Sequence, residues 1–495
     1  MHSVTMRPAY QSWSSCAHVL NPYFQRYESA VNLAAAKFSS AAATPLSTTT
    51  ATTKDRIYRL ATTRNVGMTG IMLFARDWSA LQDIRTTELG FGAGDMANKG
   101  AVGLRFSYTK EVEEGDAEEE SRKTTELTFV STHLQAMEWN LETRNKNWAT
   151  IASRLVFDDP KKYINSSSTN RPTIQPTPRG AGNNDEDRGE EEAQNLLNDD
   201  DDDDDDDSEA ARQKALHDIS IFKPGAHLFV SGDLNYRISK TSPGSGAVFP
   251  SLDPASPDHY ARFLALDQLT AEREAGHTLH GLSEAEIRFP PTYKLKIAST
   301  TPVKKADTAP RGEEQQGDGD EDMDEVEELL EDEEVDWRWA IHRWPGWCDR
   351  VLYLDIPWWT KETLAASSSS NPLPSMTTIA YDALPAVRSS DHRAVYLRIA
   401  VPVLDSAELA PSPAAIEAEL ARGDVDGSKR IVDPRVKLPF PIDAQSWDHR
   451  AFVKQWEQAL GWSMLVSQSR PAIALFATML VVGLGAWWFG RVGLV

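Results

Sequence analysis

Short apolar runs of strand length alternate along the chain with longer stretches of helical periodicity. Runs of four to eight residues in which apolar side chains dominate or alternate with polar ones are typical of β-strands. Such runs lie at 70–75, 101–108, 127–132, 227–231 and 395–400. The segments 139–156 and 259–275 read instead as helices. The pattern predicts a domain that mixes strands with helices and carries polar residues in loops just past its strands.

Hydrophobicity is most continuous near the C-terminus. Residues 471–489 contain no charged side chain and lie between Arg470 and Arg491. A helix of this length spans about 28 Å, close to the hydrocarbon thickness of a bilayer, and Trp487 and Trp488 suit its interface. The pattern predicts a tail anchor at 471–490, with a buried core helix as the alternative. Only two cysteines and no apolar run near Met1 agree with a cytosolic domain.

Charge is distributed unevenly over the 495 residues. The formal net charge is -23, but the segments 111–120, 185–209 and 313–336 together carry -37, which leaves about +14 on the remainder. A basic body suits a polyphosphate or an anionic lipid surface. The acidic segments, which include nine consecutive aspartates at 199–207, are predicted to be solvated disordered insertions. A regulatory or protein-binding role is the alternative.

Three polar motifs beside strand-like runs share one chemistry. Residues 231–237 read Ser-Gly-Asp-Leu-Asn-Tyr-Arg, 347–350 read Trp-Cys-Asp-Arg and 390–392 read Ser-Asp-His. Hydrolysis of a phosphate ester needs a water in line behind phosphorus and stabilisation of the charge that grows on the phosphate oxygens. Carboxylates, an amide and a histidine fixed by an aspartate meet these needs. The motifs therefore indicate a divalent-metal phosphoesterase site.

With three further blocks, these motifs resemble the inositol polyphosphate 5-phosphatases, a branch of the endonuclease/exonuclease/phosphatase superfamily. The resemblance covers roughly 56–400, and its blocks are 94–102, 133–136 with 144–145, 232–237, 289–294, 343–350 and 390–393. The layout is most similar to tail-anchored fungal phosphatidylinositol 4,5-bisphosphate 5-phosphatases. The family implies an α+β fold of DNase I type, a four-layer α/β/β/α sandwich of two mixed sheets.

The resemblance also implies roles for individual residues. The implied catalytic residues are Asp233, which orients or deprotonates the attacking water, Asn235, which holds the phosphate, His392 on the scissile phosphate, Asp391 on the metal or water, Asp349, which orients the histidine, and His133, which donates to a phosphate oxygen or the leaving group. The implied substrate-binding residues are Tyr293, Lys294, Arg343, Asn98, Lys99, Arg144, Arg237 and Arg350. The implied cofactor is Mg²⁺, with Asp391 as its ligand.

The sequence departs from the family pattern in two places. Ile341 stands where the family often has a lysine, two residues before Arg343, so highly phosphorylated soluble inositols are expected to bind less tightly. The first family strands, which end in Trp-Asn and Gln-Glu and supply the main Mg²⁺-binding Glu, have no counterpart before Arg56. We expect either a chain truncated upstream of Met1, which we favour, or a protein without that carboxylate.

These observations predict four segments: an N-terminal remnant at 1–55, a catalytic domain at 56–400 with acidic inserts at 160–212 and 298–336, a linker at 401–470 and the anchor at 471–490.

The predicted function is Mg²⁺-dependent hydrolysis of the 5-phosphate of phosphatidylinositol 4,5-bisphosphate or a related inositol polyphosphate. We expect it at the cytosolic face of a membrane, by resemblance the endoplasmic reticulum. A catalytically impaired, membrane-tethered phosphoinositide binder is the alternative. The blocks at 289–294 and 343–350 disfavour a nuclease or a sphingomyelinase, and nucleic acid is not an expected partner.

Overall fold

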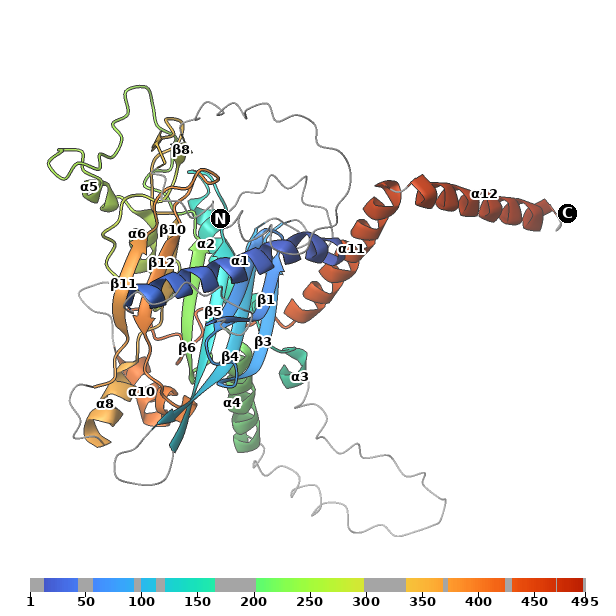
Figure 1. Ribbon diagram of the computed structural model, residues 1–495. Helices are drawn as coiled ribbons and strands as arrows, with labels where there is room; N and C mark the ends of the chain where they lie inside the picture. Colours follow the sequence, from blue (N-terminus) through green and yellow to red (C-terminus); the bar gives the residue numbers. More distant parts are fainter. Residues whose placement is uncertain are drawn as a thin grey trace, which may run out of the picture.

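The computed structural model describes residues 13–42, 57–92, 99–112, 121–164, 202–297, 335–367, 373–422, 430–468 and 470–492. Strands and helices alternate along these residues (Figure 1). The α+β prediction is therefore confirmed.

A six-stranded mixed sheet forms the centre of the structure. In spatial order its strands are β3 (Leu81–Gly90), β4 (Gly100–Val112), β5 (Ser121–His133), β6 (Ala226–Asp233), β10 (Asp349–Tyr353) and β7 (Ser283–Glu284). Strands β5 and β6 are parallel, and the other neighbours are antiparallel. The ends of β5 and β6 therefore reach the same edge of the sheet, where β10 begins.

Two antiparallel hairpins pack against this sheet. One joins β1 (Arg59–Val66) to β2 (Thr69–Ala75), and the other joins β11 (Thr377–Ala383) to β12 (Val395–Ala400). Strand β2 contacts β4 and β5, and β12 contacts β10. The prediction of two mixed sheets is corrected, because no strand within the described residues joins the two hairpins into a second sheet. A further antiparallel pair consists of β8 (Leu295–Ile297) and β9 (Trp337–Trp339).

Helix α1 (Trp13–Ala42) crosses the strands in Figure 1 and contacts β1 and α11. Asn32 fixes the chain ahead of β1: its Oδ1 accepts from the Tyr58 N–H at 2.8 Å, and its Nδ2 donates to the Tyr58 carbonyl at 2.9 Å. Glu28 Oε1 accepts from the Leu60 N–H at 3.3 Å. The segment predicted as a remnant at 1–55 therefore contains a helix that is bonded to the first hairpin.

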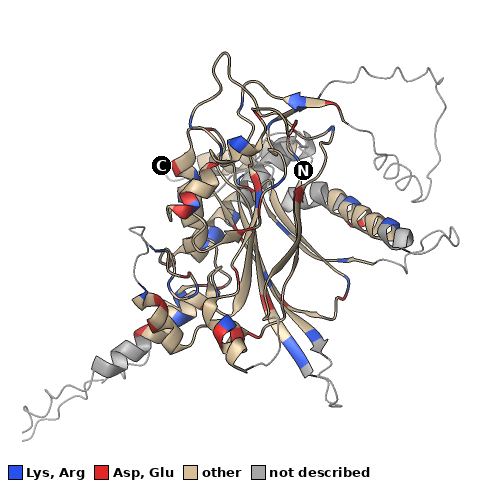
Figure 2. Cartoon of the chain, turned by 90° about the vertical axis from the view of Figure 1, so that its left-hand side faces the viewer, with Lys and Arg blue, Asp and Glu red and all other residues tan. Residues whose placement is uncertain are grey.

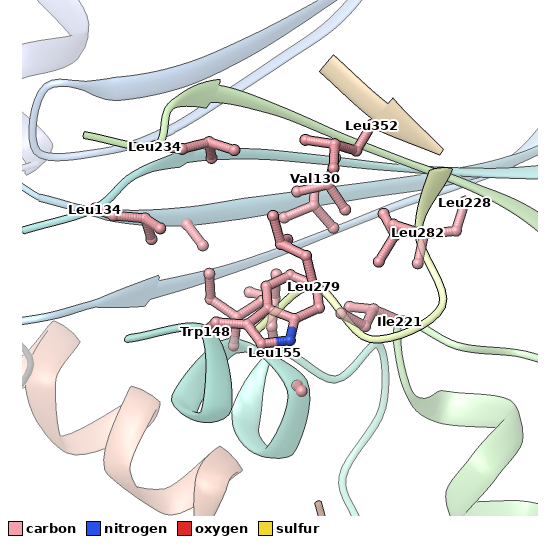
Figure 3. Packing of buried hydrophobic residues seen from close by; sticks show 14 of the residues in the cluster. Val130, Leu134, Trp148, Leu155, Ile221, Leu228, Leu234, Leu279, Leu282 and Leu352 are labelled. Atoms are coloured by element: carbon pink, nitrogen blue, oxygen red, sulfur yellow. The ribbon is translucent and has the colours of Figure 1, made fainter. Parts of the chain in front are cut away.

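The main hydrophobic core lies between the central sheet and helix α2 (Leu141–Arg154), which confirms the helix predicted at 139–156. Trp148 of this helix and Leu155 just after it are buried (Figure 3). Val130 and Leu228 face them from β5 and β6. This packing holds β5 and β6 rigidly, and with them the residues at their ends.

The helix predicted at 259–275 is two short helices, α5 (Ala261–Leu264) and α6 (Gln268–Glu274). Asp267 lies between them in an extended conformation and accepts a hydrogen bond from the Thr270 N–H at 3.0 Å. This N-cap starts a new helix, which breaks the predicted continuous one.

Helix α4 (Asp202–Ile219) corrects the expectation of an extended aspartate run, because the helix begins within that run. Carboxylates near a helix N-terminus interact favourably with the helix dipole, which opposes their mutual repulsion. Helix α3 (Lys161–Ile164) lies in the same predicted insert. The predictions for 165–201, 298–334 and 113–120 lie outside the described residues.

The predicted linker at 401–470 folds onto the body. It contains α9 (Ser406–Leu409), α10 (Pro413–Ala421) and α11 (Ser446–Gln468), and α8 (Trp358–Ser367) precedes it. Leu404 and Leu409 are buried with Ile356, and Phe440 packs on the main core. Lys454 of α11 pairs with Glu88 of β3 at 2.8 Å. The linker prediction is corrected for these residues, because buried apolar side chains and an ion pair tie them to the body.

Helix α12 (Arg470–Val492) follows α11 and extends away from the body (Figure 1). Several of its apolar side chains are more than half exposed, among them Leu475, Val481 and Trp488. Among the described residues, no helix combines the length and the apolar character needed to cross a membrane. The transmembrane part of the fold prediction is therefore unsupported.

Candidate active site

Three strand ends place a row of polar side chains along one edge of the central sheet. His133 ends β5 and lies in register with Asp233 at the end of β6. Asp349 begins β10 and lies opposite Asp233 on its other side. The sheet thus brings together three residues that the sequence carries in three separate motifs.

The backbone at the end of β6 depends on glycine. Gly232 has φ of 140°, and a Cβ there would overlap the carbonyl group of Thr132 on β5. Asn235, three residues on, has φ of 58°, a conformation that asparagine adopts more readily than most residues. The Gly-Asp-Leu-Asn order therefore satisfies the backbone as well as the chemistry.

Asp233 is buried and has a partner on each carboxylate oxygen. Its Oδ2 lies 3.2 Å from His133 Nε2, and its Oδ1 accepts from the Asn235 N–H at 3.0 Å. Burial alone raises the pKa of Asp233, but the hydrogen bond from His133 and the charges of His392 and Lys99 outweigh it, so the pKa lies below its ordinary value. The carboxylate is ionised at neutral pH, as a base or a water-orienting group must be.

Asn235 is held from two sides. Its Nδ2 donates to the Leu134 carbonyl at 3.1 Å, and the Arg237 guanidinium donates to its Oδ1 and, through Nε at 3.0 Å, to its carbonyl. Arg237 is 3% exposed and stacks 4.3 Å from the centre of the Tyr293 ring. The structure therefore gives Arg237 a positioning role, in place of the direct substrate contact that the sequence predicted.

Asp349 of β10 and His392, which precedes β12, form a hydrogen-bonded pair. His392 Nδ1 lies 2.8 Å from Asp349 Oδ2, and the Thr292 hydroxyl donates to the same oxygen at 2.8 Å. Burial disfavours the imidazolium form, but the Asp349 carboxylate outweighs this and raises the pKa of His392. The Tyr293 ring lies 4.6 Å from the imidazole, centre to centre. The histidine is thus fixed in place and can carry a proton to a phosphate oxygen.

Cationic side chains border this row. Lys294 Nζ lies 2.6 Å from Asp391 Oδ2, and Lys99 Nζ donates to the Leu134 carbonyl at 3.0 Å and contacts His133 Nε2. Burial lowers the pKa of Lys99 to about 8. Over the rest of the body, Lys and Arg are interspersed with Asp and Glu (Figure 2). Lys294 and Lys99 therefore supply local positive charge beside the row.

Arg343 borders the same site from the segment between β9 and β10. Its Nη1 donates to Glu138 Oε2 at 2.7 Å, and its Nη2 lies 3.1 Å from the sulfur of Met137. The predicted substrate-binding arginine is thus paired with a carboxylate from the segment after His133.

Two other arginines predicted to bind substrate are structural. Arg350 is completely buried: its Nε lies 2.6 Å from Glu284 Oε1, and its Nη1 lies 2.9 Å from Asp267 Oδ2. Arg144 is also fully buried and donates to the Met137 carbonyl at 2.7 Å. A guanidinium enclosed with its own partners favours a structural role for both arginines over the predicted substrate contact.

One further predicted substrate residue, Asn98, lies outside the described residues.

The described residues do not form a complete metal site. No three of their His, Cys, Asp or Glu side chains group as ligands for a metal ion. Asp391, the predicted Mg²⁺ ligand, is paired with Lys294. Protein Mg²⁺ sites commonly use one or two carboxylates with waters and substrate phosphate, and Asp391 alone provides a single, already paired carboxylate. The residue types therefore suit Mg²⁺, and Asp391 supplies one of the carboxylates that such a site uses.

Sequence comparison decides the family of the chain. The sequence profile of Endonuclease/Exonuclease/phosphatase family 2 matches residues 27–398, well over half of the chain. The chain belongs to this family.

Within this family, the similar curated proteins are named as inositol phosphate or phosphoinositide phosphatases. Type II inositol polyphosphate 5-phosphatase 15 of Arabidopsis thaliana is 26% identical over 63% of this chain and 21% of its own length. Inositol-1,4,5-trisphosphate 5-phosphatase 1 of Schizosaccharomyces pombe is 24% identical over 58% and 16%. Human phosphatidylinositol 3,4,5-trisphosphate 5-phosphatase 2 is 29% identical over 54% and 13%. The chain spans about a fifth or less of the length of these relatives.

Among solved structures, the inositol polyphosphate 5-phosphatase domain of SPsynaptojanin, in complex with inositol (1,4)-bisphosphate and calcium, is 20% identical. The match covers 69% of this chain and 61% of that one, with a TM-score of 0.36.

Sequence reasoning missed two residues that bond to members of the candidate site. Thr292, which bonds Asp349, lies inside the block at 289–294, and that block was a sufficient signal. No sequence motif marked Glu138, because its partner Arg343 lies 205 positions away in the sequence.

Proposed function

We propose that this chain is a phosphatase that removes the 5-phosphate from an inositol phosphate or phosphoinositide. The observation that carries the proposal is the row of His133, Asp233 and Asp349 across three strand ends, with His392 bonded to Asp349. The names of the similar proteins support the same reaction class.

Each residue of the row suits one part of phosphate hydrolysis. The ionised Asp233 accepts a proton from the attacking water or orients that water. Asn235 Nδ2 has two protons, of which the Leu134 carbonyl takes one, and the amide supplies a donor for a phosphate oxygen. His392, protonated beside Asp349, neutralises charge on the transferring phosphate, and His133 or Lys99 donates toward the leaving oxygen.

The finer proposal is phosphatidylinositol 4,5-bisphosphate as substrate, Mg²⁺ as cofactor and a cytosolic membrane face, by resemblance the endoplasmic reticulum, as the location. The tail at 471–490 would hold the domain near its lipid and raise the local substrate concentration. Bound Mg²⁺ would neutralise phosphate charge, and Asp391 is the described residue that we expect to contact it.

A second candidate is a phosphoinositide-binding protein with impaired catalysis. The observation that favours it is the absence, within the described residues, of a three-ligand metal cluster. A binder needs the cations beside the strand ends and does not need the metal.

The test is release of inorganic phosphate from phosphatidylinositol 4,5-bisphosphate in mixed micelles, with Mg²⁺ and with a chelator. We expect Mg²⁺-dependent release, and Asp233→Asn is expected to lower kcat by at least ~10²-fold, about 2.7 kcal/mol. Asp253→Asn, which changes an exposed aspartate in a turn, is the matched control. Binding to the lipid without phosphate release, in the presence of Mg²⁺, would support the second candidate instead.

A further inference from the structure

We propose that Glu138 determines substrate specificity by holding Arg343 and opposing the positive charge that Arg343 presents to phosphate groups. The proposal rests on the proposed function and deepens it: it favours inositols with few phosphates over those with more.

Glu138 is a buried carboxylate at the border of the site. It is 1% exposed, and Arg343 is its single ion-pair partner within the described residues, at 2.7 Å. Its second oxygen, Oε1, is buried without a hydrogen-bond partner in that same part of the chain. A buried negative charge with one partner is costly unless that partner stays in place. Glu138 therefore restrains the Arg343 guanidinium strongly.

The ion pair connects two walls of the site. Glu138 lies in the segment between His133 and α2, whereas Arg343 belongs to the segment between β9 and β10. That second segment is bonded to the substrate side of the site, because the Arg343 N–H donates to the Ala340 carbonyl and the Ala340 N–H donates to the Lys294 carbonyl. Glu138 thus fixes Arg343 relative to both His133 and Lys294.

The pair also sets the charge of this wall. The Arg343 side chain is 19% exposed, so a substrate phosphate can approach it, but the carboxylate beside it offsets its charge. Ile341, 79% exposed on the same segment, adds no charge. Each extra phosphate brings about -1.5 to -2 charges toward a wall that carries one compensated cation. Lys294 and Lys99 bind the first phosphates of the substrate, and each further phosphate adds little binding free energy.

The experiment compares two soluble substrates that share the 5-phosphate: inositol 1,4,5-trisphosphate and inositol 1,3,4,5-tetrakisphosphate. Glu138→Gln keeps the size and an acceptor oxygen but removes the charge. We expect this variant to lower the KM for the tetrakisphosphate, relative to the KM for the trisphosphate, by at least about fivefold. The ratio of the two kcat values should change less. Glu138→Asp keeps the charge and is expected to keep the wild-type preference.

The matched control is Glu142→Gln, an exposed glutamate four residues on, which should leave the KM ratio as in wild type. An unchanged ratio in Glu138→Gln, or an equal shift in Glu142→Gln, would overturn the proposal. A wild-type chain that releases no phosphate from either compound would refute the proposed function instead. In that case calorimetry gives the dissociation constants of the wild-type chain and of Glu138→Gln for the two compounds. The ratio of these constants tests the effect of Glu138 without any turnover.

Discussion

Replacing Arg350 tests whether this arginine is structural or contacts substrate. It is completely buried, with both Nε and Nη2 2.6 Å from the Glu284 carboxylate and Nη1 2.9 Å from Asp267. The side chains of Glu284 and Asp267 are 4% and 0% exposed. Arg350→Met fills similar space but leaves the buried Asp267 carboxylate without its cation and the Glu284 carboxylate with Arg273, at 3.9 Å, as its remaining one.

The expected loss of stability follows from that geometry. Removing one partner from a buried ion pair typically costs about 3–5 kcal/mol, because the remaining charge stays desolvated. A domain of this size loses roughly 3 kcal/mol of unfolding free energy per molar urea. Arg350→Met should therefore lower the urea midpoint by about 1–2 M. Adding Glu284→Gln and Asp267→Asn removes the stranded charges, and we expect it to recover at least half of the loss.

The assay is urea unfolding followed by tryptophan fluorescence, with phosphate release measured in parallel. Arg262→Met, which removes an exposed arginine from α5, is the control and should change stability by less than about 0.5 kcal/mol. If Arg350→Met shifts the midpoint no more than this control while it raises KM, Arg350 contacts substrate and the structural interpretation is refuted.

Three other outcomes are expected. Lys294→Ala should lower kcat/KM and relax discrimination against lipids that lack the 4-phosphate, measured by phosphate release; an unchanged preference would remove Lys294 from the substrate contacts. Deleting residues 471–495 should release the protein from membranes, and pelleting of the shortened protein after a carbonate wash would contradict the tail anchor. Burial, with Arg435 nearby, lowers the pKa of His227 to about 4, so the unfolded chain binds this proton more tightly than the folded one. The free energy of unfolding should therefore fall by up to about 3 kcal/mol as the pH falls from about 6.5 to 4; His227→Gln should flatten that slope in urea titrations, and an unchanged slope would exclude His227 as its source.

Local periodicity predicted several strands well, because their apolar side chains run together or alternate with polar ones. The run at 395–400 matches β12 residue for residue, and 227–231 lies within β6. The order of strands within a sheet depends on contacts across the whole chain. Local patterns therefore did not show that the β1–β2 and β11–β12 hairpins stay separate from each other. The break at Asp267 was missed for a different reason, because a single capping side chain overrides a helical pattern that continues on both sides.

The same contrast explains the site. The motifs correctly selected the residue types that the structure brings together, since His133, Asp233 and Asp349 each end or begin a strand of the same sheet. Burial and charge pairing between distant segments were not predictable, because they depend on side chains far apart in the sequence. Glu138 is the clearest case, since nothing near it in the sequence indicates Arg343.

The arginines show how partners, not motifs, separate the roles. Arg237, Arg343 and Arg350 all lie in blocks that resemble the family, so the resemblance implied substrate binding for all three. Arg350 has two carboxylates in a sealed interior, which makes it a support for β10. Arg237 has the Asn235 amide as its partner, which makes it a support for the catalytic row. Arg343 alone of these three combines one carboxylate with a partly exposed guanidinium, and that combination leaves it able to meet a phosphate while Glu138 limits how strongly it does so.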